Sequence, residues 1–298
     1  MNLIEEELIR KQKNYVLDHR EGTWMNNKKF RSGLLVGIIM LIMSIFIGTL
    51  ISVFFKAESS RDILQMFNRY FLAILGSVLM AKWCGLDFRF KTKNLLKGIF
   101  VTGITMHAYV ILDLVEKYVK LEMTVIQAIP RIVFVFVATM GVGFFEEMLC
   151  RGAFFNAFRF KYGESQRGIV KAAFISSFVF GLLHFMNLIG NPDILISTIA
   201  QVCYATMIGF SFSCIYYITD NFWVCAILHG LIDFAAYFWG CFVNPEASFV
   251  LDNTVHDESF LGNINEVGIC AVLTVVVFYQ LKREFAKRGV DKEQLSNA

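Results

Sequence analysis

The chain has 298 residues, of which 56% are hydrophobic, 31 are Phe and 3 are Pro. Soluble domains carry a smaller apolar share, so this composition excludes an ordinary soluble protein and indicates a protein that crosses a membrane several times. The formal net charge of +3 is too small to indicate nucleic-acid binding. The 7 cysteines are scattered through apolar runs, which favours buried thiols over disulfides or a cysteine metal site.

The first 32 residues are polar and lack the pattern of a cleaved signal peptide, so we expect a cytoplasmic N-terminal tail. Eight apolar segments follow, each long enough to cross a bilayer as a helix. They are 33–55, 70–86, 98–115, 130–151, 172–188, 194–218, 222–242 and a last span that ends at Leu281. Polar residues crowd the start of that last span. The sequence therefore predicts an all-α fold, a polytopic bundle of about eight transmembrane helices.

Lys and Arg are concentrated in alternate segments between these spans. The basic segments are 1–32, 87–97, 151–171 and 282–298, whereas the others are poor in Lys and Arg or, over 243–266, acidic. Eight crossings place both termini on one side of the membrane, and the positive-inside rule makes that side the cytoplasm. The chain contains no internal repeat and no separate soluble catalytic domain, so any chemistry must take place within the bundle.

Two adjacent carboxylates, Glu146 and Glu147, end the apolar run of the fourth span. Ionised groups inside a span cost at least a few kcal/mol each. Arg151 follows Glu147 by four residues, which places the two on one helix face in the favourable order, so we interpret them as a structural pair. Glu146 points about 100° away and has no basic partner three or four residues along its own helix. It is therefore the stronger candidate for a functional role.

Two later spans carry histidines in similar four-residue patterns. Phe180 and His184 lie on one face of the fifth span, and His229 and Asp233 lie on one face of the seventh. Between them, the sixth span repeats small and polar residues that suit close helix packing, namely Gln201, Ala205 and Gly209. At 1.5 Å per residue from the predicted cytoplasmic edge, the acid and both histidines lie roughly 8–18 Å deep. We expect them to meet in one cavity.

Three motifs in this order resemble the CPBP family (CAAX proteases and bacteriocin-processing proteins, also called Abi), which includes the type II CAAX prenyl endopeptidases and bacterial self-immunity proteins. The motifs are Glu146-Glu147-x-x-x-Arg151, Phe180-x-x-x-His184 and His229-x-x-x-Asp233. The resemblance covers about residues 130–240. It departs from the family at Asp233, where the motif often ends in Asn.

On this basis we divide the chain into five parts, of which the third is the catalytic core. They are a cytoplasmic tail (1–32), N-terminal transmembrane helices (33–129), the CPBP-like core (130–242), an extracytoplasmic loop with the last transmembrane helix (243–281) and a second cytoplasmic tail (282–298).

Peptide hydrolysis needs an activated water and a donor to the charge that develops on the carbonyl oxygen. We assign the general base to Glu146, with His184 orienting the water and passing the proton on, a pairing that the resemblance also implies. His229 would donate a hydrogen bond to the oxyanion. Asp233 could donate a second hydrogen bond only if protonated, and otherwise would orient or charge His229, the role that we favour.

The same residues leave a metal site open as an alternative. Histidines and carboxylates can bind zinc with one position left for water, and the family has been described both as metalloproteases and as metal-independent glutamate proteases. No His-Glu-x-x-His motif is present, so we favour a site without a cofactor. If a divalent metal such as zinc is bound, its expected ligands are Glu146, His184 and His229.

We therefore expect an intramembrane endopeptidase of the bacterial plasma membrane whose partners are the lipid bilayer and a peptide or membrane-protein substrate, such as a CAAX-type protein, a pheromone or a bacteriocin leader. A non-catalytic immunity or scaffold protein is one alternative. A transporter with a proton relay is another, although no inverted repeat supports it. His107 and Asp113 of the third span are interpreted as bridges between helices or as residues near the outer interface.

Overall fold

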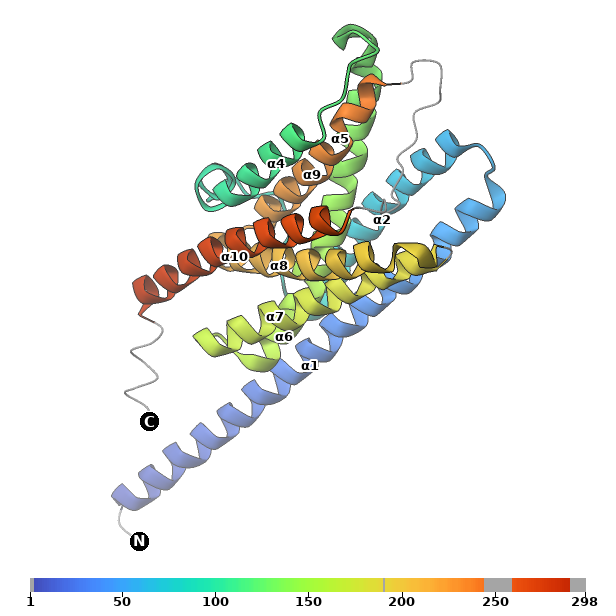
Figure 1. Cartoon of the computed structure of the whole chain (residues 1–298). Coiled ribbons are helices and arrows are strands. Elements are labelled where there is room, and N and C mark those ends of the chain that lie inside the picture. The colour runs from blue at the N-terminus through green and yellow to red at the C-terminus, as the bar shows by residue number, and fades with distance from the viewer. Residues whose placement is uncertain (1–2, 190, 244–258, 290–298) are drawn as a thin grey trace.

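The computed structural model describes residues 3–189, 191–243 and 259–289, with side chains from residue 23 onward. Within these ranges the chain is helical and contains no strand (Figure 1). The α-helices are α1 (Leu3–Phe54), α2 (Glu58–Cys84), α3 (Leu95–Lys97), α4 (Ile104–Glu116), α5 (Val125–Glu147), α6 (Asn156–Tyr162), α7 (Gln166–Leu183), α8 (Leu195–Thr219), α9 (Phe222–Phe238) and α10 (Phe260–Arg288). Shorter π-helical and 3-10 segments connect them: η1 (Gly98–Thr102), η2 (Met148–Phe155), η3 (His184–Leu188), η4 (Pro192–Ile194) and η5 (Trp239–Phe242).

The described residues form 7 helices that are long and apolar enough to cross a membrane, or 8 if one bent pair counts as a single span. The prediction of an all-helical bundle with about eight spans is therefore confirmed. The bent pair is the third predicted span, where Leu95–Thr102 and Ile104–Glu116 meet at 59°. The bend lies at Gly103, where an added Cβ would come within 2.4 Å of Leu228 Cδ1 in α9. A side chain at this point would push the bent span away from α9.

Several helices are longer than their apolar stretches. The first predicted span is the C-terminal part of α1, which begins at Leu3. The fourth predicted span continues through η2 and α6, so that one span runs from Val125 to Tyr162. Hydropathy marks the part of a helix that suits lipid, and these helices continue into polar sequence beyond it.

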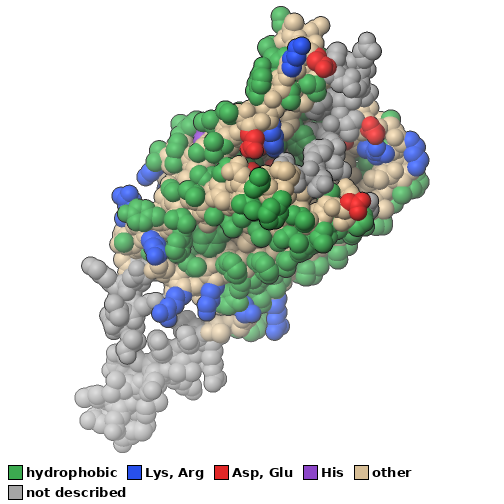
Figure 2. Space-filling model, viewed as in Figure 1, with side chains coloured by type: hydrophobic (Ala, Val, Ile, Leu, Met, Phe, Trp, Pro, Cys, Tyr) green, Lys and Arg blue, Asp and Glu red, His purple; other side chains and the backbone are tan. Residues whose placement is uncertain are grey.

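The described ends of α1 and α10 lie at the same end of the bundle, as an even number of crossings requires (Figure 1). Figure 2 shows hydrophobic side chains over the middle of the visible face, with most Lys and Arg side chains towards the end where α1 begins. That this end faces the cytoplasm stays a prediction. Much of the predicted acidic segment 243–266 lies outside the described residues, which resume at 259.

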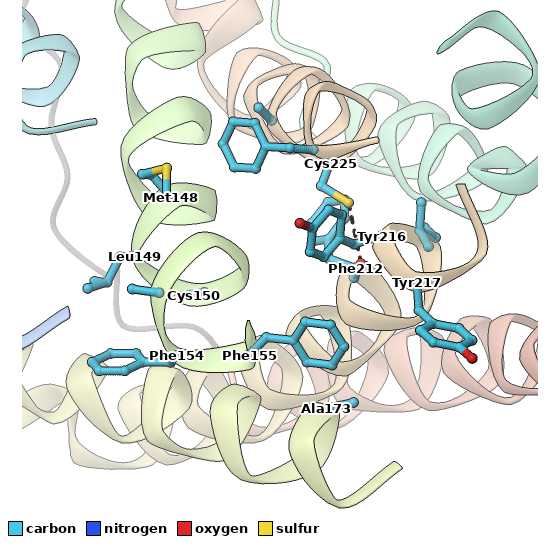
Figure 3. Packing of buried hydrophobic residues seen from close by; sticks show 14 of the residues in the cluster. Met148, Leu149, Cys150, Phe154, Phe155, Ala173, Phe212, Tyr216, Tyr217 and Cys225 are labelled. Carbon is cyan, nitrogen blue, oxygen red and sulfur yellow. Dashed lines mark hydrogen bonds between the residues drawn. The ribbon is translucent and has the colours of Figure 1, made fainter. Parts of the chain in front are cut away.

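The core of the bundle packs around η2, the segment that directly follows the two glutamates. In Figure 3, Phe155 of this segment lies on the side of Tyr216 of α8, whose ring is 5.9 Å away, and Met148 lies on the opposite side of the helix; all three are buried. The Cys225 thiol donates to the Phe212 carbonyl oxygen at 3.3 Å. All 7 cysteines are free thiols and 6 of them are buried, which agrees with the expectation from the sequence.

Candidate active site

Two glycines let α5 and α9 approach closely enough to bring their polar side chains together. A Cβ added to Gly143 would lie 2.5 Å from the backbone nitrogen of Gly230 and 2.5 Å from the carbonyl oxygen of Ala226. Small residues of this kind allow membrane helices to pack backbone against backbone. Glu146 lies less than one turn after Gly143, and His229 directly precedes Gly230. The packing therefore sets the acid beside the imidazole.

The structure brings most of the predicted site residues to one cavity of about 430 Å³. Those that line it are Glu146, Arg151, Phe180, His184, His229 and Asp233. The Glu146 side chain is 30% exposed, and its Oε2 lies 3.5 Å from Nε2 of His229. The remaining predicted residue, Glu147, is fully buried behind the cavity wall. The carboxylate that lacks a partner in its own helix thus faces a shared space between helices.

Glu147 and Arg151 form the predicted ion pair, with Nη1 3.0 Å from Oε1 and both side chains almost completely buried. The guanidinium has two further contacts on α8. Its Nη2 donates to the carbonyl oxygen of Gly209 at 2.8 Å, and its plane lies over the Phe212 ring at 5.2 Å. Arg151 therefore joins the end of α5 to α8 with its charge matched in the interior.

His229 is oriented by Glu147, which the sequence did not predict. Its Nδ1 lies 2.7 Å from Oε1 of Glu147, and its ring stacks on Phe212 at 5.4 Å. Because a carboxylate can only accept, Nδ1 carries the proton in this contact. Asp233, to which the sequence assigned the orienting role, lies farther away, with Oδ2 3.9 Å from Nε2. The four-residue spacing of His229 and Asp233 favoured a partner in the same helix, whereas the closer partner, Glu147, lies on α5.

His184 lies at the end of α7, where backbone carbonyl groups lack helical partners. Its Nδ1 is 3.3 Å from the Phe180 carbonyl oxygen and 3.2 Å from that of Gly181, and the Phe180 ring packs edge-on against it at 5.0 Å. With the proton on Nδ1, Nε2 of the neutral ring is an acceptor. Among the described residues, His229 is the histidine whose ring lies within 4 Å of the Glu146 carboxylate. Glu146 and His184 therefore do not form a direct ion pair.

The helix changes from α to π immediately after Glu147. In η2 the backbone widens over Met148–Phe155, and the Asn156 amide donates to the carbonyl oxygens of Arg151 and Gly152 at 2.7 and 3.1 Å. Insertions of this kind recur at functional sites because they change the direction of neighbouring side chains. Sequence spacing predicted the pair at Glu147 and Arg151 but not this change of helix type.

The predicted alternative metal ligands do not gather as a ligand set. Within the part of the chain that the structure describes, no three His, Cys, Asp or Glu side chains are placed to hold a metal ion. Glu146, His184 and His229 share the cavity without such a cluster. We therefore derive no chemical step through a metal.

Polar residues from the last span also reach the cavity. Asn263 of α10 donates to the Ser197 hydroxyl at 3.1 Å, and Tyr109 of α4 donates to the Glu266 carboxylate. Asn263 and Glu266, two of the polar residues at the start of this span, thus line the cavity. Their unusual position in an apolar segment was the sequence signal that could have identified them.

Asp113 and His107 are placed differently by the structure. Asp113 pairs at 2.7 Å with Lys117, the residue directly after its own helix, and lines the main cavity, so it does not bridge two helices through this contact. His107 contacts the Gly103 carbonyl oxygen at 3.2 Å and lines a separate, apolar cavity of about 280 Å³ between α4 and α9. Neither residue joins Glu146 and His229.

Residues 128–235 match the family model of type II CAAX prenyl endopeptidase Rce1-like proteins. The matched segment covers a little over a third of the chain and includes all three motifs that line or support the cavity. None of the curated proteins matches this chain. The chain is therefore a multi-pass integral membrane protein in which residues 128–235, called the Rce1-like domain below, match the model of a CAAX-type protease family.

Proposed function

We propose that this protein is an intramembrane endopeptidase that hydrolyses a peptide bond in a membrane-associated peptide or protein. The observation that carries the proposal is the partly exposed Glu146 carboxylate, 3.5 Å from Nε2 of His229 in a cavity of about 430 Å³. A carboxylate in such a site can take a proton from water, and the surrounding helices keep lipid away from the reaction.

In the proposed reaction, Glu146 removes a proton from a water molecule, whose oxygen attacks the carbonyl carbon of the substrate. Nε2 of His184, which lines the same cavity, accepts a hydrogen bond that orients this water, then takes up the proton released by Glu146 and gives it to the leaving amine as the C–N bond breaks. His229 donates to the oxyanion from Nε2 as an imidazolium, because its Nδ1 already contacts Glu147. Carboxylates of three residues lie within 4 Å of this ring and supply the counter-charge: Glu146, Glu147 and Asp233.

We propose a bacterial plasma-membrane enzyme that acts on a CAAX-type protein, a peptide pheromone or a bacteriocin leader. Support for the membrane setting comes from the number of apolar helices. Support for a peptide substrate comes from the Rce1-like domain. The short, non-basic connections around the later spans resemble bacterial members of the family.

The test compares membranes that contain the wild-type protein with membranes that contain Glu146→Gln. We expect uncleaved precursor peptides to accumulate with Glu146→Gln, and cleavage to fall about 10²–10⁴-fold, the usual contribution of a general base. Quantitative mass spectrometry of membrane peptides measures both. A metal chelator is expected to leave cleavage by the wild type unchanged.

The matched control is Glu58→Gln, since Glu58 is an exposed glutamate in the first turn of α2 whose partner is Arg61. It should leave the peptide profile as in the wild type. Identical profiles for wild type and Glu146→Gln, with both proteins present in the membrane, would rule out the protease and favour a scaffold that needs no chemistry.

A further inference from the structure

Hydrogen bonds between connecting segments define the two ends of the bundle. At one end the Asn221 amide donates to the Lys91 carbonyl oxygen at 2.9 Å, which ties the turn between α8 and α9 to a Lys- and Arg-rich connection. At the other end the Trp239 indole donates to the Leu114 carbonyl oxygen at 2.7 Å, which ties the end of α9 to the end of α4. We call the first the basic end and the second the opposite end.

The main cavity extends inward from the opposite end. Along α8 its lining runs from Ser197, two residues after the helix begins, to Phe212, seven residues before the helix ends. These 15 residues of helix correspond to about 22 Å at 1.5 Å per residue. Helix α4 lines the cavity with its C-terminal half and α10 with its first turns, both of which lie at the opposite end. Phe212 stacks on His229 at 5.4 Å, so the lining of α8 reaches the level of the candidate active site.

Exposed charged side chains line the cavity at the opposite end. Glu116 and Lys117 both line it and are exposed, the Lys117 side chain by 46%. Charged side chains at the end of a span lie where the membrane meets water, because they are costly in hydrocarbon. The path towards Glu146 therefore starts in water.

Packed side chains close the cavity towards the basic end. Phe155 and Ile215 are fully buried there, and the Phe155 ring lies 5.9 Å from that of Tyr216. Tyr216 and Asn221 line a separate cavity of about 290 Å³ at the basic end. No described residue lines both this cavity and the main one, so the layer between them separates the active site from the basic end.

The positive-inside rule places the basic end in the cytoplasm. We propose that the cavity opens on the extracytoplasmic side and that the substrate is an exported polypeptide, with its cleaved bond in a segment outside the cytoplasm. An extended chain of about six or seven residues covers the 22 Å from the opposite end to the level of His229. This inference rests on the proposed peptidase function and on the predicted orientation. It selects a pheromone or a bacteriocin leader over a cytosolic CAAX-type protein.

The experiment labels introduced cysteines with a small, charged thiol reagent that does not cross membranes, in right-side-out and in inside-out membrane vesicles. Ile208→Cys places a thiol in the cavity, about 20 Å from the start of α8. We expect it to react at least about tenfold faster in right-side-out vesicles, because the reactive thiolate forms in water and the cavity is open to water on that side. Reaction of the wild type gives the background from native thiols.

Two matched variants control for depth and for side. Val275→Cys lies about 22 Å from the start of α10, is 68% exposed and does not line the cavity, so it should face lipid and react in neither preparation. Asp220→Cys lies exposed in the turn between α8 and α9 and should react in inside-out vesicles alone.

The substrate class is tested on the precursor peptides that accumulate with Glu146→Gln. A soluble protease added to right-side-out vesicles should degrade their uncleaved segments, since these lie outside. Precursors that stay protected until the vesicles are opened would overturn the inference.

The labelling has its own contrary results. Faster reaction of Ile208→Cys in inside-out vesicles, or no reaction in either preparation, would overturn the extracytoplasmic route. Reaction from the outside without any precursor that accumulates with Glu146→Gln would contradict the proposed peptidase and leave the route to the cavity standing.

Discussion

Arg151 is a charged side chain in the interior of the bundle. Its charge is buried, 1% exposed, against Glu147, with a hydrogen bond to Gly209 and the face of Phe212 below it. Removing one member of such a pair is far more costly than replacing both, because the remaining ion is left without a counter-charge. Glu147 also contacts His229. Its two contacts, one with Arg151 and one with His229, allow its contribution to stability to be measured separately from its contribution to the reaction.

We expect Glu147→Met to lower the free energy of unfolding by about 3–5 kcal/mol, since it leaves Arg151 unpaired in the interior. The double variant Glu147→Met, Arg151→Met should regain most of that stability, because two well-packed apolar side chains then replace the pair. Thermal unfolding in detergent measures both. Peptide cleavage should stay at least about tenfold below wild type in both variants, as His229 has lost its orienting carboxylate.

Recovery of stability together with full activity would show that the contact between Glu147 and His229 does not matter for cleavage.

At this scale the sequence predicted the pair of Glu147 and Arg151, because its spacing is local to one helix. It did not predict the partner of His229, because that contact joins residues 82 positions apart and depends on how α5 and α9 pack.

At the scale of elements, the packing of α5 against α9 decides whether a site exists. Gly143 faces backbone atoms of α9 at distances that no side chain accommodates without movement of a helix. We expect Gly143→Ala to lower the free energy of unfolding by about 1–3 kcal/mol, in the range of other overpacked positions, and to reduce cleavage by moving Glu146 away from His229. Thermal unfolding and peptide cleavage are measured on the same preparation.

The matched control is Gly268→Ala in α10, where an added Cβ meets nothing within 4 Å. Replacing a glycine inside a helix should leave stability unchanged or raise it by up to about 1 kcal/mol. Equal behaviour of the two variants would mean that the close approach at Gly143 does not position the site.

The sequence predicted the helices better than their shapes. Apolar runs located every span, since hydrocarbon thickness sets the length of a crossing. They did not show the bend at Gly103 or the π-helical segment after Glu147, because both follow from contacts with α9 and α8. Small residues in a span indicate close packing but not the helix that approaches.

At the scale of the whole molecule, the alternating basic loops and the shared end of α1 and α10 give one testable topology. With cytoplasmic termini, the loop that contains Lys120 is outside the cell and the loop that contains Glu164 is inside. We expect a membrane-impermeant thiol reagent to label Lys120→Cys in intact cells and to label Glu164→Cys only after the membrane is opened. Wild type, whose thiols are mostly buried, gives the background. The reverse pattern would place the basic loops outside.

The cavity has one more consequence. Under the proposed reaction every turnover consumes a water molecule, and a hydrocarbon layer is nearly dry. A space of about 430 Å³ has room for on the order of ten waters at ~30 Å³ each. Helices α4, α8 and α10 place polar groups around this space, so that water can be held in it within the membrane. Under the proposed reaction, a substrate that enters the cavity would therefore meet water inside it.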